Sequence, residues 1–154
     1  MAGIPHVALM IETSSIYGRR LLEGITRYVR SHRPWSIFLE QRELDSQPPR
    51  WLETWRGDGV ISRCSSPDVA AALRGAGVAA VDLCDRWGSF GLARITSDDP
   101  AIGTLAAEHL RERGFRSFGF CGFADELWVV RRREGFLQAL ARTGGTERVY
   151  ESHW

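Results

Sequence analysis

The sequence predicts an α/β fold built on a parallel β-sheet, because two kinds of segment alternate along the chain. Between Val7 and Cys121, short runs of β-branched or aromatic residues alternate with segments that have the capping residues and amphipathic spacing of helices. Strands that alternate with helices form parallel βαβ units, and parallel sheets bury both of their faces. Such sheets bind ligands at the carboxyl ends of their strands. Function is therefore expected in the segments that follow the strands, which are 12–18, 62–66, 82–90 and 121–132.

The first half of the chain contains three strand–helix repeats. After the apolar run VALMIE, Leu21, Leu22 and Ile25 recur close to a period of 3.6 residues, which predicts a helix. The tripeptide Ser66-Pro67-Asp68 supplies an N-cap, a proline at the first helical position and an acid in the first turn. Residues 41–50 are polar and contain proline, which indicates a loop. The predicted strands and helices are, in order, 7–12, 17–31, 36–40, 49–55, 59–62 and 66–74.

The alternation is interrupted after the strand AAVDL (79–83). The segment that follows, DRWGSFGLARITSDDP, supplies glycines, aromatics and a very short apolar run at Ala93–Thr96, but no helix. A strand that passes directly into another short strand and then a capped helix is typical of a crossover between two lobes. We therefore place a lobe boundary at Ile95–Asp98, and we expect the first four strands to lie in the order 2-1-3-4. The predicted lobes are residues 4–95 and 98–154.

The second predicted lobe repeats the same local signals. Asp98-Asp99-Pro100 is a helix start of the same kind as Ser66-Pro67-Asp68, and Gly114 ends that helix. The aromatic run SFGFC (117–121) predicts a strand. A helix over about 126–142 follows it, and Gly144-Gly145 is expected to stop this helix.

Composition excludes several classes of protein. The 154 residues are 44% hydrophobic and 25% charged with a net charge of +1, which gives no global argument for nucleic acid as a partner. No apolar stretch is long enough to span a membrane, and the N-terminus lacks the basic start of a secretory signal, so a cytoplasmic protein without a membrane partner is expected. The odd number of cysteines, Cys64, Cys84 and Cys121, favours reduced thiols.

The motifs of common enzymes are missing from the sequence. Neither GxGxxG nor GxxxxGK follows a strand, the nucleophile motif GxSxG does not occur, and no histidine lies in the segments expected to form the crevice. The four histidines also lack the spacing to cysteine that a metal site needs. We therefore expect no catalytic residues, no metal and no cofactor.

Four segments together resemble a known family. They are IYGRRLLEGI (16–25), GDGVI (57–61), ITSDDPAIGTLAAEHLRERGFRSFGF (95–120) and the pattern W…R..GF at residues 128–136. The third segment is the most specific. Over residues 4–150 the ordered set resembles the sugar-binding region of lac-repressor-type regulators, which have the type I periplasmic-binding fold, and it is most similar to the xylose-operon regulators of bacteria.

The resemblance implies a first lobe and the incomplete beginning of a second. In such regulators a monosaccharide such as xylose binds in a cleft between two lobes and controls DNA binding, which here would reside in a region outside this chain. An unpaired sheet edge would favour a homodimer, and sugar binding by this chain alone is expected to be weak at best, in the millimolar range or worse. Two alternative functions remain open. A solute-binding protein of a sugar transport system would have to be exported. A receiver-like domain would need a cluster of acidic residues after the first strand, and Glu12 alone is too little.

Arg132 is the strongest candidate for a ligand contact. It lies near the start of a predicted helix, where the helix dipole disfavours cations, and its guanidinium can donate two hydrogen bonds to vicinal sugar hydroxyls. The family pattern also falls on Arg132. Trp128, one turn earlier, can stack on a sugar ring while its indole N–H donates to a hydroxyl. The alternatives are a solvated basic turn for Arg131–Arg133 and a core position for Trp128.

The other candidate contacts follow predicted strands. Asp82 ends the fourth strand, where its carboxylate can accept hydroxyl hydrogen bonds, and a solvated strand-end acid is the alternative. Asp85 and Trp87 follow at the same predicted sheet edge. Asp98 and Asp99 are expected to be helix caps, as is Ser15. Three further candidates for ligand contact lie in loops after the first and third strands, namely Ser14, Tyr17 and Arg63.

Overall fold

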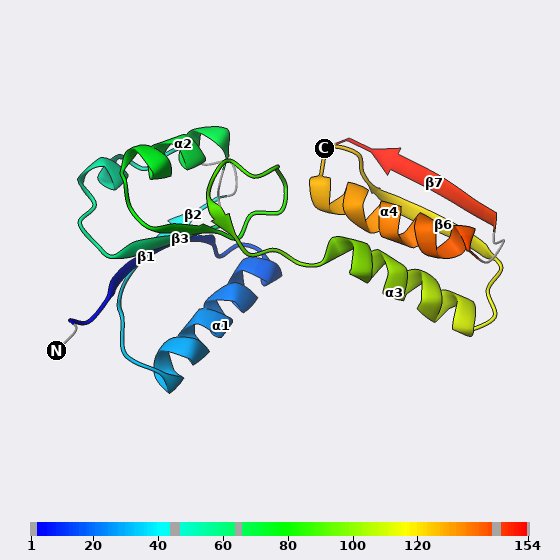
Figure 1. The fold of residues 1–154 in the computed structure, drawn as a ribbon, viewed down its shortest axis with the longest axis horizontal. Helices are drawn as coiled ribbons and strands as arrows, with labels where there is room; N and C mark the ends of the chain where they lie inside the picture. Colours follow the sequence, from blue (N-terminus) through cyan, green and yellow to red (C-terminus); the bar gives the residue numbers. More distant parts are fainter. Residues whose placement is uncertain (1–2, 44–46, 64–65, 143–145, 154) are drawn as a thin grey trace. The chain divides into compact units, whose positions relative to one another are not determined.

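The computed structural model describes residues 3–43, 47–63, 66–142 and 146–153. Contacts divide the chain into two compact units, unit 1 with residues 1–84 and 89–96, and unit 2 with residues 85–88 and 97–154. In chain order the elements are β1 (His6–Glu12), α1 (Ile16–Ser31), β2 (Ser36–Arg42), the 3-10 helix η1 (Arg50–Thr54), β3 (Gly59–Ser62), α2 (Pro67–Gly75), β4 (Ala80–Asp82), β5 (Ala93–Arg94), α3 (Asp99–Glu112), β6 (Ser117–Phe123), α4 (Leu127–Ala141) and β7 (Thr146–Ser152) (Figure 1).

Unit 1 is a parallel sheet with helices on both faces. Its five strands lie in the order β2-β1-β3-β4-β5, and every neighbouring pair is parallel. The predicted order of the first four strands is therefore confirmed. Because all strands run the same way, their carboxyl ends meet at one edge of the sheet.

The central strand β1 is buried on both of its faces, as its apolar sequence predicts. Successive side chains of a strand point to opposite faces. Leu9 and Ile11 belong to a cluster with Leu21 and Leu22 of α1, and Met10 belongs to another with Leu73 of α2. Helix α1 thus covers one face of the sheet, and α2 covers the other.

The helix starts in the structure follow the predicted capping residues. The side chain of Ser15 accepts a hydrogen bond from the backbone N–H of Gly18, and that of Ser66 accepts one from Val69. Asp98 caps α3 in the same way. The predicted helix at 49–55 is the short 3-10 helix η1, and α4 ends at Ala141. The expected stop at Gly144-Gly145 lies outside the described residues.

Unit 2 packs α3 and α4 beside a sheet of two parallel strands, β6 and β7. Its core contains Phe118 from β6 together with Phe136 and Leu140 from α4. The two helices approach closely because glycines stand at the contact: a Cβ atom added at Gly103 would lie 2.0 Å from the carbonyl oxygen of Arg132. This close approach brings the start of α3 next to the first turns of α4.

Three further observations concern membranes, thiols and metals. No helix within the described residues is both long and apolar enough to cross a membrane. Cys84 is buried and Cys121 is exposed, whereas Cys64 lies outside the described residues. The described part of the chain holds no group of three or more histidine, cysteine or acidic side chains placed to bind a metal ion.

Candidate functional site

The first candidate cluster lies at the carboxyl ends of β1 and β3 and consists of Glu12, Ser15, Tyr17 and Arg63. Glu12 is the last residue of β1 and is only 1% exposed. Its Oε1 atom lies 2.9 Å from Nη1 of Arg63 and accepts a hydrogen bond of 2.7 Å from the Ser15 hydroxyl. The Arg63 guanidinium lies 4.6 Å from the centre of the Tyr17 ring. We call this group the Glu12 cluster.

Local sequence explains why the Glu12 cluster assembles. The Ser15 hydroxyl donates to Glu12 and also accepts from the Gly18 N–H, so the capping residue joins the strand end to the helix start. A Cβ atom at Gly18 would lie 2.0 Å from the Glu12 carbonyl oxygen, so only glycine allows α1 to pass this close to the end of β1. The first βα loop is therefore held against the third strand by polar contacts.

Asp82 lies at the end of β4 and is 2% exposed, so the alternative of a solvated strand-end acid is wrong. Its Oδ1 atom accepts the N–H of Cys84 at 2.9 Å, and its Oδ2 atom lies 3.5 Å from Nε of Arg94 in β5. Arg94 also donates to the carbonyl oxygen of Cys84. The Asp82 carboxylate thus holds two strand ends together, and Arg94 is a member of this group that sequence reasoning missed.

The second candidate cluster belongs to unit 2 and consists of Asp99, Trp128 and Arg132. Arg132 donates from Nε to Oδ1 of Asp99 at 2.9 Å, and its guanidinium lies 4.6 Å from the centre of the Trp128 ring. The Arg132 side chain is 29% exposed, and its two terminal nitrogens have no partner within the described residues. The structure therefore holds a guanidinium fork in place with its outer edge available to a ligand. We call this group the Arg132 cluster.

Asp99 differs from the expectation for it. Asp98 caps α3 by accepting from the N–H of Ala101, whereas the Asp99 side chain is 1% exposed and pairs with Arg132. The Oδ2 atom of Asp99 is buried without a hydrogen-bond partner among the described residues. Of the two adjacent acids, one is a cap and the other positions the candidate ligand-binding arginine.

Trp128 is placed differently from the prediction in one respect. Its indole N–H donates to Oε2 of Glu126 at 3.0 Å, so it is not available to a ligand in this arrangement. Glu126 is 3% exposed and also accepts from Nε of Arg86 at 2.8 Å. One ring face of Trp128 lies against Arg132, so a ligand could stack only on the other face. Sequence reasoning had assigned no role to Glu126 or Arg86.

The remaining candidates are dispersed. Ser14 is exposed, and its carbonyl oxygen accepts from Arg19 at 2.9 Å. Asp85 is buried and Trp87 is 41% exposed, and both belong to unit 2 rather than to the sheet edge of unit 1 where they were expected. Arg133, a neighbour of Arg132, forms an ion pair with Glu151.

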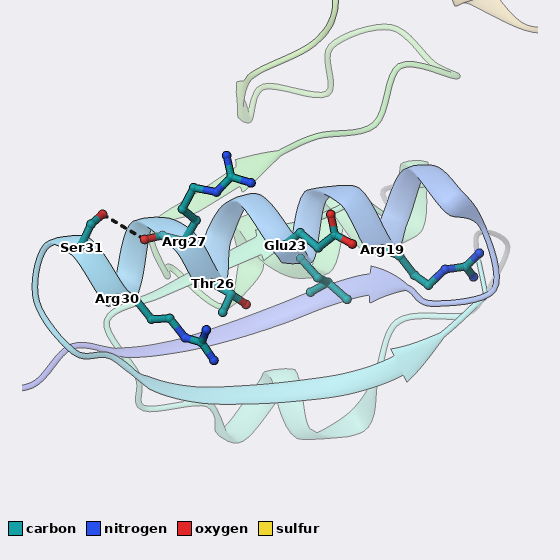
Figure 2. Close-up of a pocket in the computed structure, with 7 residues that line it drawn as sticks. Arg19, Glu23, Thr26, Arg27, Arg30 and Ser31 are labelled. Carbon is teal, nitrogen blue, oxygen red and sulfur yellow. Dashed lines mark hydrogen bonds between the residues drawn. The ribbon is translucent and has the colours of Figure 1, made fainter.

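A shallow groove on α1 lies apart from both clusters. It has a volume of about 730 Å³ and is open to solvent (Figure 2). All of its lining residues come from this single helix, and none of them is a ligand-contact candidate from the sequence. The lining residues are Arg19, Leu22, Glu23, Thr26, Arg27, Arg30 and Ser31.

Comparison with known proteins identifies the family. Residues 6–104 match the family described as the XylR N-terminal domain. The chain belongs to this family. The observed parallel sheet is accordingly the periplasmic-binding-protein-like fold of such regulators, as the sequence predicts.

Curated relatives of this XylR-type chain are regulators of transcription rather than enzymes. The chain is 28% identical over 160 residues to the xylose operon regulatory protein of Escherichia coli strain K12, and 24% identical over 156 residues to that of Haemophilus influenzae. These alignments cover 95% and 94% of the chain and 39% of each relative. The chain thus spans about two fifths of the length of these relatives.

Solved structures show the same fold. The structure of the xylose-binding transcription activator xylR matches with a TM-score of 0.78 and 24% identity, over 97% of this chain and 39% of that one. A regulator from Alkaliphilus metalliredigens, complexed with D-xylulofuranose, matches with a TM-score of 0.69 and 19% identity over 97% of this chain and 57% of that one. A periplasmic ribose ABC transporter from Conexibacter woesei matches with a TM-score of 0.77 and 19% identity, over 99% of this chain and 55% of that one. The fold is therefore common to regulators and transport proteins.

Proposed function

We propose that this chain is the sugar-sensing region of a bacterial transcriptional regulator and binds a monosaccharide such as xylose. Residues 4–95 would be its first lobe, and residues 98–154 the beginning of its second. The observation that carries the proposal is the family match over residues 6–104, together with relatives named as xylose operon regulators. A cytoplasmic location follows from that role.

The Arg132 cluster supports a sugar as the ligand. Asp99 binds Nε of Arg132, which leaves the two terminal nitrogens pointing away from that contact and able to donate to neighbouring hydroxyl groups. The pairing with Asp99 also balances the charge of the guanidinium, which suits an uncharged ligand. The free face of Trp128 would stack on the apolar face of the sugar.

Unit 1 offers candidate ligand contacts of its own in its first loop. Tyr17 is 39% exposed and offers an aromatic surface, and the exposed Ser14 offers a hydroxyl. Arg63 and Asp82 are both largely buried and paired with oppositely charged side chains. We propose that these two residues fix the shape of the site.

The other functions of the parent protein are proposed from its relatives. Control of DNA binding would use a region outside this chain, and the regulator would act as a homodimer. The match to a periplasmic ribose transporter keeps a solute-binding protein of a sugar transport system as the second candidate. The two candidates share a sugar ligand and differ in whether ligand binding alters affinity for DNA.

Saturation-transfer NMR with D-xylose, D-ribose and D-glucose tests the proposal, because this method detects millimolar binding. We expect saturation transfer to D-xylose from the wild-type chain and about tenfold weaker binding by Arg132→Ala, since a lost bidentate donor costs about 1–3 kcal/mol. Arg20→Ala is the control, because Arg20 is an exposed arginine that pairs with Glu23 on the surface of α1. Absence of binding to all three sugars would contradict the proposal.

A further inference from the structure

Each unit contains the same three-part arrangement of side chains. In unit 1 it is Glu12, Arg63 and Tyr17, and in unit 2 it is Asp99, Arg132 and Trp128. Both carboxylates are 1% exposed, both acid–arginine distances are 2.9 Å, and both guanidinium groups lie 4.6 Å from the ring centre. The two acid–arginine contacts use different atoms, since Arg63 places Nη1 near Glu12 and Arg132 donates from Nε to Asp99, but each arginine lies beside both a buried carboxylate and an aromatic ring.

The two arginines differ in how open they are to a ligand. The Arg132 side chain is 29% exposed, whereas that of Arg63 is 10% exposed. In the Glu12 cluster the exposed member is the ring, because Tyr17 is 39% exposed. A ligand that approaches this cluster would therefore meet the ring of Tyr17 before the guanidinium that lies against it.

We propose that Glu12 is a positioning residue for ligand recognition: it holds Arg63 against the Tyr17 ring, so that Tyr17 presents its outer face to the sugar. This inference rests on the proposed function. It goes further by giving a role to the buried Glu12, to which the family match assigns none. Glu12 acts through Arg63 and does not itself touch the ligand, since its Oε2 atom is fully buried.

The physical reason is the charge of Arg63. A guanidinium that is 90% buried needs a counter-charge, and Glu12 is the carboxylate that lies within 2.9 Å of it. Ser15 and the close approach of Gly18 fix Glu12 in turn. Loss of the charge on Glu12 would remove this counter-charge and weaken the hold on the guanidinium, so the cation–π contact with Tyr17 would weaken as well.

Glu12→Gln tests this inference, because glutamine keeps the size of the side chain and an oxygen that can accept from Ser15. We expect D-xylose to bind about fivefold more weakly to Glu12→Gln, which is the size of a lost cation–π contact. Tyr17→Leu should weaken binding at least as much. In the double variant Glu12→Gln/Tyr17→Leu, affinity should equal that of Tyr17→Leu, because Glu12 acts only by way of the ring. Glu23→Gln is the matched control on the surface of α1 and should bind as the wild type does.

A second readout needs no ligand. Because the guanidinium carbon of Arg63 lies 4.6 Å from the centre of the Tyr17 ring, the nearby δ-methylene protons should show an upfield ring-current shift in NMR spectra. Glu12→Gln should remove this shift and Glu23→Gln should keep it. Persistence of this shift in Glu12→Gln would overturn the inference, and so would additive losses of affinity in the double variant. Loss of the shift in a chain whose wild type binds none of the sugars would support the positioning role and reject the proposed function.

Discussion

Helix packing in unit 2 gives the sharpest prediction about stability, because two glycines set the distance between α3 and α4. A Cβ atom at Gly135 would lie 2.1 Å from the carbonyl oxygen of Pro100, and one at Gly103 would lie 2.0 Å from that of Arg132. Both obstructing atoms belong to the backbone and cannot rotate away. Replacement of either glycine by alanine must therefore push the helices apart.

The expected magnitude follows from two opposing terms. Alanine in place of glycine in a helix normally stabilises it by about 1 kcal/mol. Overpacking of a close contact costs about 1–3 kcal/mol, and a clash with backbone belongs at the upper end of this range. We therefore expect Gly135→Ala to lower the free energy of unfolding by about 1–2 kcal/mol. Because Asp99 and Arg132 stand on the two helices, sugar binding should weaken as well.

Urea denaturation followed by far-UV circular dichroism measures the effect. Gly24→Ala is the matched control, because Gly24 is also inside a helix and a Cβ atom there would meet nothing within 4 Å. This control should raise the free energy of unfolding by up to about 1 kcal/mol. The reasoning about helix contact is refuted if Gly135→Ala stabilises the chain as Gly24→Ala does.

Three further predictions concern unit 1. Leu73→Ala should lower the free energy of unfolding, measured by urea denaturation, by about 2–5 kcal/mol, because Leu73 is fully buried in the core and its truncation leaves a cavity. A loss below about 1 kcal/mol would mean that the sheet face covered by α2 is poorly packed. Asp82→Ala should destabilise by about 3 kcal/mol, since it leaves Arg94 without its carboxylate, and Arg94→Met in the same background should recover part of this loss in the same assay. The edge strand β2 exposes Ile37 and Leu39, so sedimentation velocity should detect self-association that grows with protein concentration. Leu39→Lys should reduce this association. A chain that stays monomeric at all concentrations would contradict the proposed homodimer.

Local signals in the sequence predicted the fold well because each acts over a few residues. Ser15, Ser66 and Asp98 cap helices where their residue types indicated. The apolar run of β1 is buried on both faces, and the strand order 2-1-3-4 is the one observed. These features depend on capping chemistry, hydrophobic periodicity and the connectivity of βαβ units.

The site was harder to predict because its contacts join residues that are distant in sequence. Glu12 pairs with Arg63, and Asp99 pairs with Arg132, 33 positions away. Asp99 resembles a cap as closely as Asp98 does, and only packing against α4 distinguishes them. One signal was present for Glu12, since a charged residue that ends an otherwise apolar buried strand needs a partner. The sequence could not say which arginine that partner is.

The proposal that a sugar binds at the Arg132 cluster is tested most directly by an NMR titration of the ¹⁵N-labelled chain with D-xylose. The Nε resonance of Arg132 and the indole resonance of Trp128 should shift together with one dissociation constant, while the indole resonance of Trp35 stays in place. Shifts confined to the arginines of the α1 groove, or no shifts at all up to molar sugar, would contradict it.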